Sequence, residues 1–158
     1  MDVGKDLDYF RKERQDVLRF LDDWDLALDL IASDDNRKNL QGLDRLRALE
    51  PGLQTIQAHC ASEEHTVEEP FHTYLEKGQI EALRTEHEEL TRLLGNLFTE
   101  LRFATLGQTS RTAIAGRRVS EFIRHHLQFE ETLLAEIEEK LAREAEEKML
   151  LRYTQSPE

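Results

Sequence analysis

The sequence has little of what a disulfide-stabilised or β-rich protein needs. It contains one cysteine, Cys60, among 158 residues, so no disulfide can form within the chain and a disulfide-stapled secreted fold is excluded. Only seven glycines and three prolines interrupt it. No stretch sustains the alternation of polar and apolar residues that is typical of strands. These deficits favour long helices over sheets.

Positive charge and long apolar runs are also scarce. The chain has 33 Asp and Glu residues against 21 Lys and Arg, a formal net charge of −12, which is the wrong sign for binding nucleic acid or an anionic membrane. No segment approaches about 20 consecutive apolar residues, and the first residues lack the apolar core of a signal peptide. We therefore expect a cytoplasmic protein that binds neither nucleic acids nor membranes.

What the sequence does contain is enough apolar residues for one domain, arranged at helical spacing. Hydrophobic residues make up 39% of the chain, which is sufficient for a single core at this length. The spacing predicts four long amphipathic helices, covering about 5–33, 51–70, 79–104 and 110–140. Their interior rows include Val17, Phe20, Leu21, Trp24, Ala27, Leu28 and Ile31 in the first, and Leu53, Ile56, His59, Glu63 and Val67 in the second. The third row is Ile80, Leu83, His87, Leu90, Leu94 and Phe98, and the fourth is Val119, Phe122, Ile123, His126, Glu130, Leu133 and Ile137.

Short connections between such helices favour an antiparallel up-and-down four-helix bundle, an all-α fold. The prediction adds a short extra helix near 37–48, because Pro51 suits the first turn of the next helix. It also adds a C-terminal helical extension after about residue 140. Residues 1–153 are expected to form the single bundle, and residues 154–158 a flexible tail. The sequence does not predict an oligomeric state.

One pattern occurs in two of the four helices. HCASEE at 59–64 and HLQFEE at 126–131 both place a histidine four residues before a glutamate, so each pair lies on one face of its helix. His87, in TEHEEL, lies on the interior row of the third helix. If these helices face one another, three imidazoles and two carboxylates meet inside the bundle.

Imidazole nitrogens and carboxylate oxygens together suit iron, manganese or zinc. Burying two ionised glutamates without compensation costs several kcal/mol each, so a metal, paired cations or protons must accompany them. A single interior histidine is more often a hydrogen-bonded core residue than a ligand, and one HxxxE pair occurs readily by chance. The repetition of the pair, with a third histidine in register, is what favours a metal site.

This set of residues resembles the hemerythrin-like, or HHE cation-binding, domains. The resemblance spans the chain to about Lys140 and implies a four-helix bundle with a non-haem di-iron centre. It implies ligand positions at His59, Glu63, His87, His126 and Glu130, with the two glutamates bridging the metals. The first helix departs from the family pattern, because FLDDWDLAL places Trp24 where a helix-1 ligand is usual. We interpret Trp24 as core packing that fills space over the site, which would leave one metal position with fewer ligands and a lower affinity.

Three functions follow from this resemblance. The first is a non-haem iron protein, with one or two ions, that binds or senses dioxygen, nitric oxide or peroxide, or handles iron. The second is an enzyme that uses the same iron to remove peroxide or nitric oxide, or that donates iron; no substrate pocket or nucleophile motif identifies a reaction. The third is a metal-free helical interaction module descended from that family.

Four further residues are weaker candidates. We interpret His125, about 100 degrees around the helix from His126, as a boundary residue rather than one that hydrogen-bonds to a metal ligand. His65 and His72 either lie at the surface or complete the metal position that has fewer ligands. Cys60 directly follows His59 and could approach the metal, although a small buried thiol is the simpler interpretation.

Overall fold

The structure, a computed structural model, describes the backbone of residues 3–66 and 74–155 and the side chains of residues 7–60 and 74–155. Every regular element in these ranges is a helix, which confirms the all-α prediction: α1 (Val3–Ile31), α2 (Asn36–Thr66), α4 (Lys77–Phe103) and α5 (Ser110–Gln155). None of the described helices is both long enough and apolar enough to cross a membrane.

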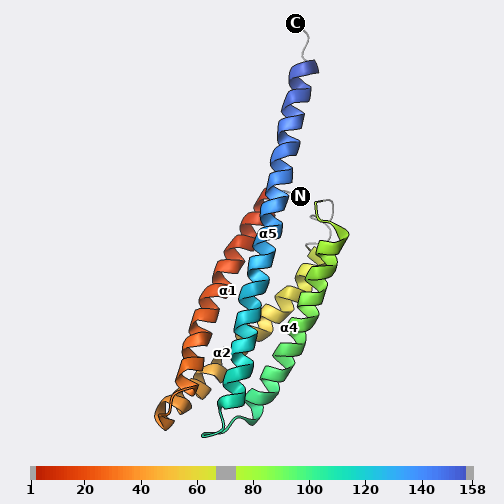
Figure 1. Ribbon diagram of the computed structural model, residues 1–158. Helices are drawn as coiled ribbons and strands as arrows, with labels where there is room; N and C mark the ends of the chain where they lie inside the picture. Colours follow the sequence, from red (N-terminus) through yellow and green to blue (C-terminus); the bar gives the residue numbers. More distant parts are fainter. Residues whose placement is uncertain (1–2, 67–73, 156–158) are drawn as a thin grey trace.

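The four helices form a bundle in which each helix packs against two others. α1 packs against α2 and α5, and α4 packs against the same two helices. Arg14 pairs with Glu131, and further along α1 Asp29 pairs with Arg117, so α1 and α5 run in opposite directions. Figure 1 shows the same reversal from α1 to α2 and from α4 to α5. The described contacts thus agree with the predicted antiparallel up-and-down arrangement.

The turn between α1 and α2 is built by side chains that satisfy free backbone groups. The Asp35 carboxylate accepts the Arg37 N–H at 2.8 Å, which caps the start of α2. The Asn39 amide donates to the Ser33 carbonyl at 2.6 Å, beyond the end of α1. The predicted end of the first helix near residue 33 is confirmed, and these polar side chains replace the missing helical hydrogen bonds.

The predicted short helix near 37–48 is not separate. α2 runs without a break through Pro51, although proline cannot donate the backbone hydrogen bond expected there. Leu43 and Leu46 before the proline are buried in the same apolar cluster as Leu53 and Ile56 after it. The prediction of two helices was wrong because this continuous packing outweighs one lost hydrogen bond.

Apolar side chains form two clusters at different heights along the bundle. The larger contains Leu21, Trp24, Ala27, Leu28, Ile31, Leu43, Leu46, Leu53, Ile56, Cys60, Leu90, Leu94, Leu97, Leu101, Ala104, Ala115, Val119, Ile123 and Leu127. The smaller contains Leu7, Leu75, Ile80, Leu133, Leu134 and Ile137. We call these the large and small apolar clusters. They account for most of the interior rows predicted from the sequence.

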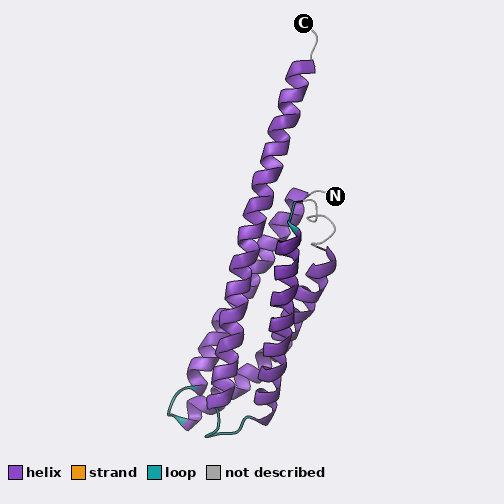
Figure 2. Cartoon of the chain, turned by 45° about the vertical axis from the view of Figure 1, so that its right-hand side comes forward, coloured by secondary structure: helices purple, strands orange, loops and turns teal. Residues whose placement is uncertain are grey.

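The predicted C-terminal extension is the last part of α5. After Leu141, every side chain to Gln155 is exposed. Figures 1 and 2 show this segment extending beyond the ends of the other helices. Thr154 and Gln155, which were expected to belong to a flexible tail, are the last residues of α5; residues 156–158 lie outside the described part of the chain.

Gly42 sets the spacing between α1 and α2, and its replacement tests this packing. A Cβ atom there would lie 2.9 Å from the Ala27 carbonyl oxygen and 2.9 Å from the Ile31 backbone nitrogen, which cannot move independently of α1. We expect Gly42→Ala to lower the free energy of unfolding by about 1–3 kcal/mol in urea denaturation, despite alanine's better helix propensity. Gly95→Ala is the control, because nothing lies within 4 Å of its Cβ position. It should be stabilising by about 0.5–1 kcal/mol, and equal stability of the two variants would contradict this account.

Candidate metal centre

A layer of polar side chains lies between the two apolar clusters. α1 contributes Glu13 to this layer, α4 contributes His87, and α5 contributes His126 and Glu130. On each of these helices the residues on one side of the layer belong to the large cluster and those on the other side to the small cluster. Cys60, at the edge of the large cluster, completes the layer from α2. The polar layer therefore interrupts the core of the bundle at one height.

Two histidines from different helices meet in this layer. His87 and His126 are 7% and 2% exposed, and their Nε2 atoms lie 3.2 Å apart. Their rings meet edge to face, with centroids 4.9 Å apart. The predicted approach of the third and fourth helices at these histidines is therefore confirmed.

Carboxylates hold His126 on both ring nitrogens. Its Nδ1 lies 2.5 Å from Glu86 Oε2, and its Nε2 lies 2.8 Å from Glu130 Oε1. Burial alone lowers the pKa of His126, but hydrogen bonds with Cys60, Glu130 and Glu86 outweigh burial and raise the pKa from 6.5 to about 12. The surroundings of His126 thus stabilise a positive charge in the interior of the bundle.

Cys60, His87 and His126 lie close enough together to hold a metal ion. All three are buried, and one ligand atom from each lies within 4.8 Å of the others. The separation of 3.2 Å between the two Nε2 atoms suits a hydrogen bond. It also suits two nitrogens bound to one ion, which lie roughly 3.0–3.4 Å apart when each bond is about 2.1 Å. The donors therefore fit a transition-metal ion in both type and spacing.

His59 pairs with α1 and does not belong to the group of Cys60, His87 and His126. Its Nε2 pairs with Glu13 Oε2 of α1 at 2.6 Å, and the two side chains are 30% and 25% exposed. Position 60, rather than 59, continues the buried row of Leu53 and Ile56. His59 was expected to join the other two histidines, but the turn of α2 directs it toward α1. Of the five predicted ligand residues, His87, His126 and Glu130 thus form one group and His59 pairs with Glu13, while the side chain of Glu63 lies outside the described residues.

Some predicted residues cannot be placed. The side chains of Glu63 and His65 lie outside the described residues, as does all of His72. His125 is described, and its side chain is 76% exposed, with Nε2 at 3.9 Å from Glu86 Oε1. His125 is therefore a surface residue, more exposed than the boundary position that the sequence predicts.

Trp24 is a core residue, as predicted, but it does not lie over the site. Its side chain is fully buried, and the indole N–H donates to the Gly116 carbonyl at 3.3 Å. Gly116 precedes His126 by ten residues of α5, a distance of about 15 Å along a helix. The expectation that Trp24 fills space over the metal was therefore wrong. The α1 residue that reaches a predicted ligand is Glu13.

Sequence reasoning missed Glu13 and Glu86 and undervalued Cys60. Glu13 was recognisable as an acidic interruption between the apolar residues Phe10 and Val17 of one helical face. Cys60 follows Ile56 by four residues, which places both on one face of α2. No comparable signal marks Glu86, because its neighbour His87 occupies the interior row and acidic residues surround both.

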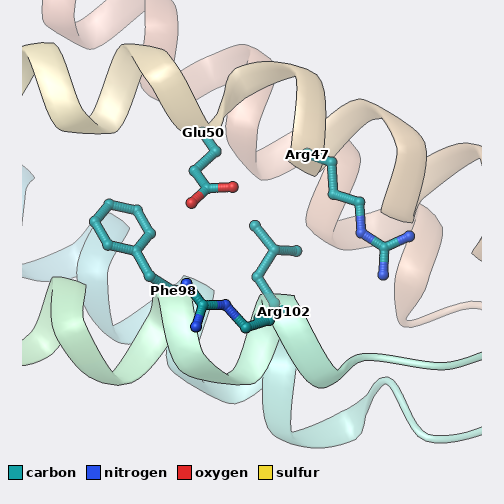
Figure 3. Close-up of a pocket in the computed structure, with 5 residues that line it drawn as sticks. Arg47, Glu50, Phe98 and Arg102 are labelled. Carbon is teal, nitrogen blue, oxygen red and sulfur yellow. The ribbon is translucent and has the colours of Figure 1, made fainter.

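A surface pocket lies elsewhere, between α2 and α4. Its volume is about 360 Å³, and it is lined by Arg47, Glu50, Phe98, Leu101 and Arg102. Figure 3 shows Glu50 pointing from α2 toward α4 beside the ring of Phe98. Phe98 is eleven residues beyond His87 on α4, about 16 Å along the helix. The pocket is therefore not part of the polar layer.

Comparisons of the chain with models of known protein families, with curated proteins and with solved structures find no match.

The raised pKa of His126 predicts how the stability of the metal-free protein depends on pH. Because the folded-state pKa exceeds the ordinary value of 6.5, the stabilisation is complete below pH 6.5 and is lost as pH rises toward 12. Urea denaturation in the presence of a chelator should show a decline above pH 6.5 that is steeper than in His126→Gln, by up to about 1.4 kcal/mol per pH unit. Parallel pH profiles for the two proteins would show that His126 is not a buried cation.

Proposed function

We propose that this chain is a hemerythrin-like non-haem iron protein that binds a small ligand, such as dioxygen, nitric oxide or peroxide, at iron held in the polar layer. The observation that carries the proposal is the contact between His87 and His126, buried and surrounded by carboxylates between two apolar clusters. Reduced iron with an open coordination position supplies the chemistry for binding such ligands. The protein residues position that iron and control what reaches it.

In the proposed first metal position, the Nε2 atoms of His87 and His126 bind the ion together with the Glu130 carboxylate. Glu86, on Nδ1 of His126, is the positioning residue, because a hydrogen bond on the second ring nitrogen fixes the orientation and tautomer of a metal-bound imidazole. The carboxylates compensate the charge of the metal in a region that is otherwise apolar. The same surroundings hold a proton on His126 when no metal is bound, so metal and proton compete for this histidine.

In the proposed second position, His59 and Glu13 bind a further ion. Their contact at 2.6 Å joins a nitrogen and an oxygen donor from different helices. Glu63 belongs to the proposed set on the grounds of its spacing from His59 in the sequence. This position has one histidine where the first has two, so we propose that it binds iron more weakly.

The size of the proposed ligand follows from the packing around the layer. His87 and His126 are almost fully buried, and leucine and isoleucine side chains lie on both sides of them. The pocket between α2 and α4 does not open onto them. Such a site suits a ligand of two or a few atoms rather than an organic substrate.

One observation favours the alternative of a metal-free interaction module. His126 already has a carboxylate partner at each ring nitrogen, so it is satisfied without a metal. In that case the layer would be a buried ion-pair network that fixes the register of the helices. Metal analysis separates the two functions directly.

We expect the protein, after anaerobic loading with ferrous iron and desalting, to retain iron in elemental analysis. His87→Ala should weaken iron binding on the order of 100-fold or more, since loss even of a residue that only hydrogen-bonds to a metal ligand costs about 10–100-fold. His87→Ala leaves both carboxylates of His126 paired, so the variant should fold. His125→Ala is the control, with an exposed histidine beside the site, and should retain wild-type iron. Wild-type protein without iron, or equal retention by both variants, would favour the metal-free module.

The second metal position has its own test at Glu13. We expect Glu13→Gln to lower the iron stoichiometry from two to one, because the amide loses the charge and the donor strength of the carboxylate. Asp16→Asn, three residues away on α1, is the matched control and should leave the stoichiometry at two, since Asp16 is exposed and pairs only with Arg19 among the described ion pairs. If Glu13→Gln keeps two ions, the pair of His59 and Glu13 is not a metal position.

A further inference from the structure

The donor set in the polar layer contains a sulfur atom that the hemerythrin-like resemblance does not include. We propose that Cys60 binds the first metal ion as a thiolate, and that oxidation of its sulfur by a hydroperoxide releases the ion. This inference rests on the proposed function, because it concerns the same ion. It adds a sulfur ligand and a means of regulation.

The position of the sulfur supports the first part of this proposal, that Cys60 binds the ion. Cys60 is 7% exposed, and its Sγ lies within 4.8 Å of a ring nitrogen of both His87 and His126. The three side chains come from α2, α4 and α5, so the sulfur approaches the pair of imidazoles from a third helix. A thiolate in an apolar core is costly unless a cation is adjacent. A transition-metal ion at this point supplies that cation, and thiolate and imidazole together form a strong ligand set for it.

The surroundings of Cys60 allow a small oxidant to reach it. Cys60 is itself 7% exposed, so part of its surface touches solvent, and the preceding residue, His59, has a side chain that is 30% exposed. Hydrogen peroxide is little larger than water. Cys60 is also the only cysteine, so its oxidation cannot end in a disulfide within the chain.

The proposed reaction is balanced with hydrogen peroxide as the oxidant. The thiolate sulfur attacks one peroxide oxygen, an S–O bond forms and the O–O bond breaks. Sulfur loses two electrons, and the leaving hydroxide takes the proton of the new sulfenic acid to give water and a sulfenate. The added oxygen displaces the sulfur from its place beside the two imidazoles, so the ion keeps only nitrogen and carboxylate ligands and its affinity falls. An external thiol reduces the sulfenate and restores the site.

Cobalt binding tests whether the sulfur is a ligand. We expect wild-type protein with one equivalent of Co²⁺ to show a near-ultraviolet band from charge transfer between thiolate and metal. The band should be absent in Cys60→Ser and Cys60→Ala, and both variants should bind Co²⁺ at least about tenfold more weakly. Far-ultraviolet circular dichroism checks that the variants fold. A second test uses the wild-type protein alone. One equivalent of Zn²⁺ should slow alkylation of Cys60 by iodoacetamide at least about tenfold.

Zinc release tests the regulation, because Zn²⁺ itself is not oxidised. Hydrogen peroxide should release Zn²⁺ from wild-type protein to a chromogenic chelator in step with a mass gain of one oxygen atom, and dithiothreitol should restore binding. Cys60→Ser should keep its Zn²⁺ under the same treatment. Tight Co²⁺ binding without the band and with equal affinity in Cys60→Ser would overturn the thiolate ligand, and equal Zn²⁺ release from both proteins would overturn the regulation. Wild-type protein that binds none of Fe²⁺, Co²⁺ and Zn²⁺ would instead overturn the proposed function, and this inference with it.

Discussion

The polar layer between the two apolar clusters is the constraint on which the rest of the structure depends. Apolar side chains fill the bundle on both sides of it, and within it His126 contacts His87, Glu86 and Glu130. Groups of this kind are costly to bury unless each has a partner and the charges are compensated. The raised pKa of His126 places a positive charge beside the two carboxylates, and this compensation makes the layer compatible with a folded core.

The register of the helices determines whether the layer can assemble. A one-turn shift of α5 would move His126 about 5.4 Å away from His87. Two kinds of contact oppose such a shift. At Gly116, α5 packs closely against Leu28 of α1 and accepts the Trp24 indole N–H, and ion pairs between α1 and α5, such as Arg124 with Asp25, lie along the surface of the bundle. Each surface pair contributes only about 0.2–1 kcal/mol, but together they favour a single alignment.

The helices and most of the core could be predicted from the sequence because apolar spacing records which face of a helix is buried. The contact of His87 with His126 followed from the same reasoning, since both lie on the apolar rows of neighbouring helices. The side of α2 that faces the layer did not follow. His59 and Cys60 are adjacent, and which of them points inward depends on the rotation of α2 between α1 and α4, which only the packed structure defines.

Glu13 and Trp24 show a second limit. The family resemblance drew attention to Trp24, but the pairing of α1 with α2 and α5 decides which α1 residue reaches the layer, and that residue is Glu13. Pro51 shows a third limit, because a local helix-breaking signal was overridden by burial on both sides of it. In each case tertiary packing decided what local sequence could not.

Anomalous X-ray diffraction at the iron edge, from crystals of iron-loaded protein, tests the central claim most directly. The account predicts a strong peak inside the bundle, within bonding distance of Nε2 of both His87 and His126. The account would be contradicted if iron were found only at surface carboxylates, with no peak between these two nitrogens.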